Sequence, residues 1–207
     1  MAETHYSLNR DLDEARAMVE GLDDYVQGDR LYGSVEGAGM YSADSTMPSL
    51  TIGGLLLRLH RLHKLEGQMS PEQRAILTII ETEHERVRKE WSVHYLQKLA
   101  NEAGARLHSL EAFFAECEDD PEGCAGAYLP EAQRRTILQD IVDALSEYHM
   151  PDSGLDHSLK SHDVQLRRLT EPTEFIWDAK LQTVYPREKY WWLYVEPTGE
   201  TEEQEVE

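Results

Sequence analysis

The chain has 207 residues, with 40 Asp and Glu against 20 Lys and Arg, and its formal net charge is -20. A field of this sign repels phosphate backbones and anionic headgroups, so we expect neither duplex nucleic acid nor a membrane surface as a partner. The length suits one helical domain over residues 1–195, and the glutamates after Pro197 favour a disordered acidic tail over residues 196–207.

The sequence lacks an export signal, a membrane-spanning stretch and the cysteine spacing of a zinc site, and these three features indicate its compartment. The first residues, MAETHYSLNRDLDEA, lack the basic opening and the apolar run of an export signal. The most apolar stretch, residues 50–57, is far shorter than the roughly 20 residues of a membrane-spanning helix. Cys117 and Cys124 could close a small disulfide loop, but they lack the paired spacing of a zinc site, and we interpret them as free thiols. We therefore expect a cytoplasmic protein.

Apolar residues at steps of four and three predict an amphipathic helix near the start of the chain. Ser7 or Asn9 can cap its first turn, and Gly28 lies just past its end. Its stripe consists of Leu8, Leu12, Ala15, Val19, Leu22 and Val26. Residues 32–48 follow, rich in Gly, Ser and Asp and without a period, and they predict a long loop.

The second helix is expected over residues 49–65 and should be the central one, since leucines surround most of its circumference. Its last turns form a local basic patch of Arg58, His60, Arg61, His63 and Lys64. Cations at this end complement the negative end of the helix dipole, so the patch has a structural explanation that needs no ligand.

A third helix begins after Ser70, which can form a capping box with Gln73, and its pattern continues almost to Cys117. A straight helix of this length would measure roughly 67 Å, while a compact chain of this size has a radius of gyration of about 17 Å. We expect a break or kink near Gly104, because glycine weakens a helix interior. The alternative is a projecting helix that pairs with a second copy in a homodimer.

Two further helices are predicted, one from about Pro130 and one over residues 153–169, where the apolar stripe is interrupted by His162. The last ordered piece is aromatic and contains Pro186, so we expect one or two short extended segments that wrap over the bundle. The alternative is an exposed partner-binding patch. That patch would consist of Trp177, Trp191, Trp192 and Tyr194.

Three histidines from separate helices lie on or beside apolar stripes, namely His63, His84 and His162. Glu81 precedes His84 by one helical turn, a spacing that aims both side chains the same way in bundles that hold iron or manganese. A divalent Fe, Mn or Zn ion held by these four residues would activate a water molecule. The competing interpretation is hydrogen-bonded core histidines, since carboxylate-bridged sites need a second Glu-x-x-His unit and further glutamates.

Arg88 and His94 lie close together in the segment RKEWSVH. In these two residues the segment resembles the RNA-cleaving motif of helical HEPN-type nucleases, which implies a ribonuclease. A solvated helix face explains Arg88 equally well, through pairing with neighbouring glutamates, and the negative charge of the chain opposes RNA binding.

The sequence contains no glycine-rich nucleotide loop, GxSxG elbow or HExxH motif. We predict an all-α bundle of about five helices with an aromatic, partly extended C-terminal segment and no cofactor. The expected function is that of a non-catalytic, cytoplasmic interaction or scaffolding protein whose acidic surface binds another protein, a basic one for preference. The alternatives are a metal-dependent helical-bundle enzyme and the HEPN-like ribonuclease.

Overall fold

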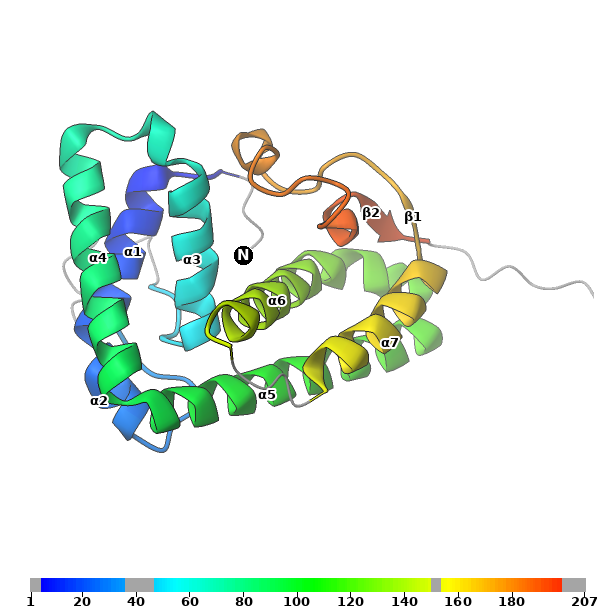
Figure 1. Cartoon of the computed structure of the whole chain (residues 1–207). Coiled ribbons are helices and arrows are strands. Elements are labelled where there is room, and N and C mark those ends of the chain that lie inside the picture. Colours follow the sequence, from blue (N-terminus) through cyan, green and yellow to red (C-terminus); the bar gives the residue numbers. More distant parts are fainter. Residues whose placement is uncertain (1–4, 36–46, 150–153, 199–207) are drawn as a thin grey trace, which may run out of the picture. The chain divides into compact units, whose positions relative to one another are not determined.

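The structure is a computed structural model that describes residues 5–35, 47–149 and 154–198. It is 72% helical, with seven α-helices and two short strands in these ranges, which confirms the predicted all-α fold with an aromatic C-terminal segment (Figure 1). None of the helices in these ranges has both the length and the hydrophobicity of a membrane-spanning segment. Most of the predicted loop at residues 32–48 and of the predicted tail at 196–207 lies outside the described residues.

The chain divides into two compact units, and the boundary between them falls inside helix α5 (Ser92–Asp119). The N-terminal unit covers Tyr6–Gly104, and the C-terminal unit begins at Ala105. Helix α5 carries the chain across this boundary without a break, and a single domain over residues 1–195 stays a prediction.

Helices α1 (Leu8–Glu20) and α2 (Leu22–Gln27) contain the first predicted stripe, most of which is buried. Ser7 caps α1 as expected, since its hydroxyl accepts a hydrogen bond from the backbone N–H of Arg10. The single helix that we expected is divided at Gly21, whose N–H donates to the Val19 carbonyl. Glycine weakens a helix interior, and a stripe of apolar residues does not reveal the interruption.

Helix α3 (Ile52–Lys64) is the helix predicted over residues 49–65; it is largely buried, but α1 rather than α3 is the helix that packs on both of the others. Thr51 caps it, because the Thr51 hydroxyl accepts a hydrogen bond of 3.0 Å from the N–H of Gly54. Leu55, Leu57 and Leu62 are fully buried. Helices α1, α3 and α4 lie side by side, with α1 packed on both of the others (Figure 1). A short 3-10 helix, η1 (Glu66–Gln68), follows α3.

Two basic residues of α3 are buried between helices rather than arranged in solvent at the helix end. Arg58 forms an ion pair with Glu14 of α1, with 2.6 Å between Nη2 and Oε2, and each side chain is 8% exposed. Arg61 is fully buried, and its Nη1 lies 3.8 Å from Oδ1 of Asp11. The helix-dipole explanation therefore does not account for these two residues, whose charges hold α3 to α1.

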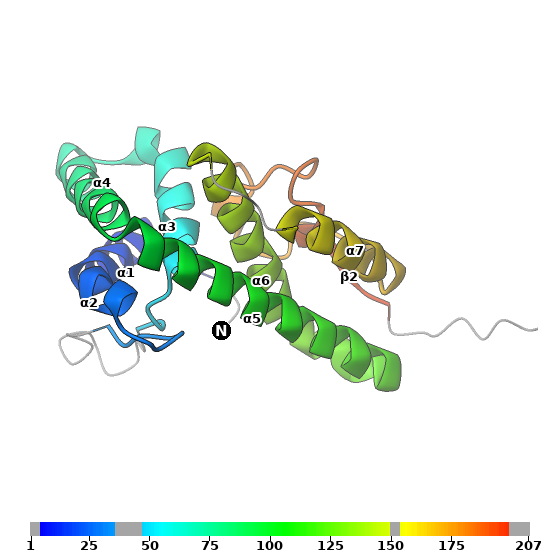
Figure 2. The ribbon, with the colours of Figure 1, turned by 60° about the horizontal axis from the view of Figure 1, so that its bottom comes forward.

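Helix α4 (Pro71–Glu90) begins at the predicted capping box, in which Ser70 and Gln73 exchange hydrogen bonds between side chain and backbone. The long helix that we predicted is divided into α4 and α5 at Trp91, where the backbone has φ -110 and ψ 33. The predicted break near Gly104 is wrong, because α5 continues through this residue (Figure 2). Glycine costs a helix about 1 kcal/mol, and burial of its neighbours Leu99 and Ala103 offsets that cost.

Helix α6 (Pro121–Glu147) begins before the predicted start, and Pro130 lies inside it. Asp120 is the single residue between α5 and α6, and its carboxylate caps α6 by accepting a hydrogen bond of 3.0 Å from the N–H of Gly123. Because proline has no N–H to donate, it is common in the first turn of a helix, and Pro130 therefore suggested that the helix begins there. The buried side chains of Tyr128 and Ala132, on either side of Pro130, maintain the helix despite the missing hydrogen bond.

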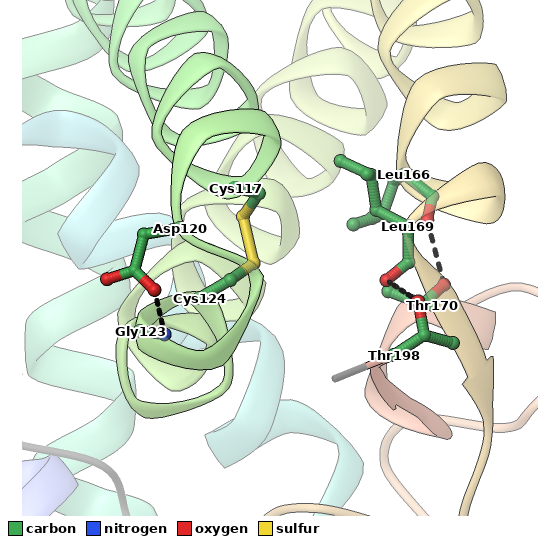
Figure 3. Close-up of a disulfide and its surroundings, with 8 residues drawn as sticks. All are labelled: Cys117, Asp120, Gly123, Cys124, Leu166, Leu169, Thr170 and Thr198. Carbon is green, nitrogen blue, oxygen red and sulfur yellow. Dashed lines mark hydrogen bonds between the residues drawn. A yellow bond between two sulfur atoms is a disulfide. The ribbon is translucent and has the colours of Figure 1, made fainter. Parts of the chain in front are cut away.

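Cys117 of α5 and Cys124 of α6 form a disulfide across this turn (Figure 3). The interpretation of free thiols is therefore wrong. The one-residue turn brings the two Cα atoms to 5.0 Å, within the range that a disulfide spans, and sequence spacing alone does not reveal this distance. The cytoplasmic assignment relied on reduced cysteines, so the compartment stays a prediction.

Helix α7 (Leu155–Arg168) confirms the last predicted helix, with Leu155, Leu159 and Leu166 buried on one stripe beside His162. After it, strand β1 (Thr170–Pro172) pairs antiparallel with strand β2 (Val195–Pro197), as the prediction of short extended segments requires. The residues between the strands include two 3-10 helices, η2 (Ala179–Leu181) and η3 (Trp191–Leu193).

Candidate functional site

Two members of the predicted metal site, His63 and Glu81, are in contact. His63 comes from the last turn of α3 and Glu81 from the middle of α4, and Nε2 of the histidine binds Oε1 of the glutamate. The two side chains are 52% and 39% exposed. At this exposure the contact is a surface interaction, which contributes little to stability.

His84 is buried and has a different partner, the hydroxyl of Tyr95. The Nε2 atom lies 2.9 Å from this hydroxyl, which belongs to α5, so the contact bridges the break between α4 and α5. Burial lowers the pKa of His84 to about 4, and the nearby positive charge of Arg88 acts in the same direction. The ring is therefore neutral at neutral pH, as a hydrogen-bonded core histidine should be.

His84 gives the free energy of unfolding a specific pH dependence. The unfolded state, with an ordinary histidine pKa of about 6.5, binds the additional proton below that pH, so stability is lost as the pH falls toward 4. Through this group we expect the wild-type protein to lose about 2 kcal/mol between about pH 7.5 and about pH 5. The glutamine of His84→Gln can still form a hydrogen bond but cannot titrate. Over the same pH range, the free energy of unfolding of this variant, measured in urea, should therefore fall by about 2 kcal/mol less than that of the wild type. Equal losses in the two proteins would contradict a buried, neutral His84.

His162, the fourth predicted ligand, belongs to the C-terminal unit. Its Nδ1–H donates to the Ser158 carbonyl at 2.7 Å, and its Nε2 lies 3.5 Å from Oε1 of Glu111. In the described ranges no group of three or more His, Cys, Asp or Glu side chains is arranged to hold a metal ion. The structure thus brings together His63 and Glu81 and leaves the four-residue metal site a prediction.

The two residues that suggested a ribonuclease lie on either side of the Trp91 break. Arg88, on α4, binds both carboxylate oxygens of Glu85 at 2.8 and 2.7 Å. His94, on α5, is exposed, and its ring centroid lies 5.9 Å from that of Trp91. The pairing of Arg88 is the one that a solvated helix face predicts, and the ribonuclease stays an untested prediction.

Most of the aromatic residues that could have formed a partner-binding patch are buried within the C-terminal unit. Among Trp177, Trp191, Trp192 and Tyr194, only Trp191 is half-buried. The indole N–H of Trp192 donates to the hydroxyl of Thr136 at 2.9 Å, and the Trp192 carbonyl accepts from the hydroxyl of Tyr128 at 2.6 Å. Both partners lie on α6, so these contacts attach the aromatic segment to that helix. Partner binding by these residues is a prediction that the structure does not test.

A groove of about 490 Å³ lies between α1 and α4 of the N-terminal unit. Val19 of α1 and Ile80 of α4 are its buried apolar floor. Ile76 is half-buried, and Ile79 is 65% exposed. Single exposed apolar residues are normal on a surface, but here three isoleucines and a valine share one concavity. The groove therefore exposes contiguous apolar surface that no described part of the chain covers.

The direction of the two helices shows which residues lie at each end of the groove. Gln73, early in α4, donates to Asn9, early in α1, at 2.6 Å. Arg86, late in α4, binds Asp23 of α2 at 2.9 Å. The α1–α2 segment and α4 therefore run in parallel, and the late residues Glu20 and Glu83 share one end of the groove.

Acidic side chains gather at this late end. Arg86 is shared by the carboxylates of Asp23, Glu83 and Glu90 at 2.9, 2.6 and 2.5 Å. Glu20 also lines a second cavity, of about 560 Å³, together with Asp24. One end of an apolar groove is thus surrounded by negative charge.

The density of apolar residues in one segment of the sequence indicates this groove, although their periodicity does not. Residues 75–80, AILTII, hold five apolar side chains in six positions, which is more than one buried stripe needs. Leu77 and Ile80 fill the stripe toward the core, and Ile76 and Ile79 widen the apolar face on one side.

Comparisons of the chain with protein-family models, with curated proteins and with solved structures find no match. The chemistry of its own surface is therefore the basis for a functional proposal.

Proposed function

We propose that this chain is a non-catalytic protein-interaction protein that binds a helical segment of another protein in the groove between α1 and α4. The observation that carries the proposal is the exposure of Ile79, which is 65% accessible in a concave apolar surface. Water in contact with this surface would be released when apolar side chains of a partner fill it, and burial of one such side chain is worth about 1.5–3 kcal/mol.

A helix suits this groove better than an extended segment does. The wall contributed by α4, from Ile76 to Glu83, is the middle of a helix, whose backbone N–H and C=O groups are paired within that helix, and the other wall is the last turn of α1. An extended segment would find no backbone partners along α4 and would bury its own peptide groups unpaired there. An amphipathic helix brings a fully hydrogen-bonded backbone and presents apolar side chains at the i, i+3, i+4 and i+7 spacing.

The test is a substitution of the exposed isoleucine of the groove, with a matched control in the other unit. We expect Ile79→Asp to weaken the binding of an amphipathic helical peptide by about tenfold or more, because a charge replaces the exposed apolar contact. The probe is a fluorescein-labelled, alanine-rich peptide of about 15 residues with a row of leucines, and fluorescence anisotropy measures its dissociation constant.

Val164→Asp is the matched control, because Val164 is 52% exposed on α7 and is likewise an apolar residue on a helix surface. This variant should bind the peptide as the wild type does. Equal affinities for the wild type, Ile79→Asp and Val164→Asp would show that the groove is not the binding surface.

A further inference from the structure

We infer that the partner of the α1–α4 groove is a basic amphipathic helix, whose apolar row contacts Ile76 and Ile79 and whose Lys or Arg side chains lie against Glu20 and Glu83. This inference rests on the proposed function, because it names the partner of the same groove. It goes beyond that function by fixing the charge of the partner and the residues that select it.

Negative charge exceeds positive charge around the late end of the groove and the cavity beside it. Three guanidinium groups, those of Arg16, Arg30 and Arg86, lie among six carboxylates. The carboxylates are those of Glu20, Asp23, Asp24, Asp29, Glu83 and Glu90. The excess of negative charge is local, and the net charge of -20 of the whole chain adds to it. Such a field accelerates the approach of a cationic segment and repels an anionic one.

Pairing within the protein leaves the carboxylates at this end ionised without neutralising their charge. The hydrogen bond from Arg86 keeps the pKa of Glu83 below its usual value, so Glu83 is charged at neutral pH. The same guanidinium also serves Asp23 and Glu90, and one positive charge cannot balance three negative ones. Glu20 forms an ion pair with Arg16, with 3.1 Å between Oε1 and Nε, and both side chains are more than half exposed. Lys or Arg side chains of a partner can therefore approach these carboxylates from solvent.

The same charges disfavour a second copy of this chain as the occupant. In a twofold-symmetric pair the same surface of each copy would face the other, so the excess of negative charge around one groove would lie against an equal excess around the second. The homodimer through the third predicted helix, which contains α4, would add this repulsion to that of two chains of charge -20. A basic helix offers the same apolar contact without the repulsion.

The test compares three peptides that share one leucine row and carry lysine, glutamine or glutamate beside it. We expect the lysine peptide to bind the wild-type protein about tenfold more tightly than the glutamine peptide at about 20 mM salt, and the two affinities to converge at about 500 mM. The glutamate peptide should bind most weakly. The double variant Glu20→Gln/Glu83→Gln should weaken the lysine peptide by about three- to tenfold and leave the glutamine peptide unchanged.

A control of equal charge separates local recognition from net charge. Glu147→Gln/Glu174→Gln removes two exposed carboxylates from the C-terminal unit and should change the affinity of the lysine peptide by less than about twofold.

The outcomes distinguish the inference from the function on which it rests. Equal binding of the lysine and glutamine peptides, lost in both cases in Ile79→Asp, would overturn the basic partner and retain the groove. Failure of every peptide to bind in a manner that depends on Ile79 would remove the proposed function as well. A wild-type dimer in sedimentation that Ile79→Asp dissociates would identify a second copy as the occupant and overturn the inference.

Discussion

Arg58→Met is expected to lower the free energy of unfolding by about 3 kcal/mol, because it leaves Glu14 in the interior without its main counter-charge. In the wild type the guanidinium binds Oε2 of Glu14 through Nη2 at 2.6 Å and through Nε at 2.8 Å. It also donates to the Gly54 carbonyl at 2.7 Å. Arg10 remains as a partner of Glu14 at 2.8 Å but is half exposed, so water screens its charge.

The control for Arg58 is the double variant Glu14→Gln/Arg58→Met, which removes both buried charges. A buried ion pair can often be replaced by uncharged residues at little cost, so the double variant should recover most of the stability that Arg58→Met loses. Urea unfolding of the wild type and the two variants measures the three free energies. An Arg58→Met protein within about 0.5 kcal/mol of the wild type would show that the pair does not hold α1 to α3.

Trp192→Ala is expected to destabilise the C-terminal unit by about 4 kcal/mol, as is usual when a buried tryptophan is truncated. Trp192 is 1% exposed, donates to Thr136 and lies 3.9 Å beneath the guanidinium of Arg135. Its loss would leave a cavity against α6 and remove the hydrogen bond to the Thr136 hydroxyl. Thermal unfolding followed by circular dichroism measures the effect.

Trp191 is the matched control, because it is the same residue type in the same 3-10 helix and is only half-buried. The guanidinium of Arg167 lies 3.6 Å from its ring centroid, and the ring of Trp192 lies edge-on with a centroid distance of 6.0 Å. We expect Trp191→Ala to cost about 1 kcal/mol. Similar small losses for Trp191→Ala and Trp192→Ala would contradict the packing of this segment and favour the alternative of an exposed patch.

Helices that bury a regular apolar stripe could be predicted from the sequence, and interruptions of helices could not. The stripes placed α3 and α7 and the start of α1 correctly, and the capping box at Ser70 gave the start of α4. Gly104 and Pro130 misled because their intrinsic costs, about 1 and 3 kcal/mol, are smaller than the burial that surrounds them. The disulfide depends on a turn of one residue at Asp120, a tertiary distance that spacing does not encode.

The candidate site depended even more on packing. Histidines on apolar faces suggested a metal, but the partner of His84 is Tyr95, which lies beyond a helix break that periodicity did not reveal. The groove depends on Ile79 being left uncovered, and a pattern of apolar residues does not show which of them find a neighbour. The negative charge at its late end follows from the parallel course of α1 and α4, which brings Glu20 and Glu83 together.

If the α1–α4 groove is the surface that binds a partner, the methyl groups of its isoleucines will report the binding directly. The chain contains seven isoleucines, of which Ile76, Ile79 and Ile80 line the groove. In methyl NMR spectra, the lysine-flanked peptide should shift the δ1 signals of these three residues in a saturable manner. The signals of isoleucines in the C-terminal unit, such as Ile137 and Ile141, should stay in place. Saturable shifts confined to the C-terminal unit, with the groove signals unmoved, would contradict the account.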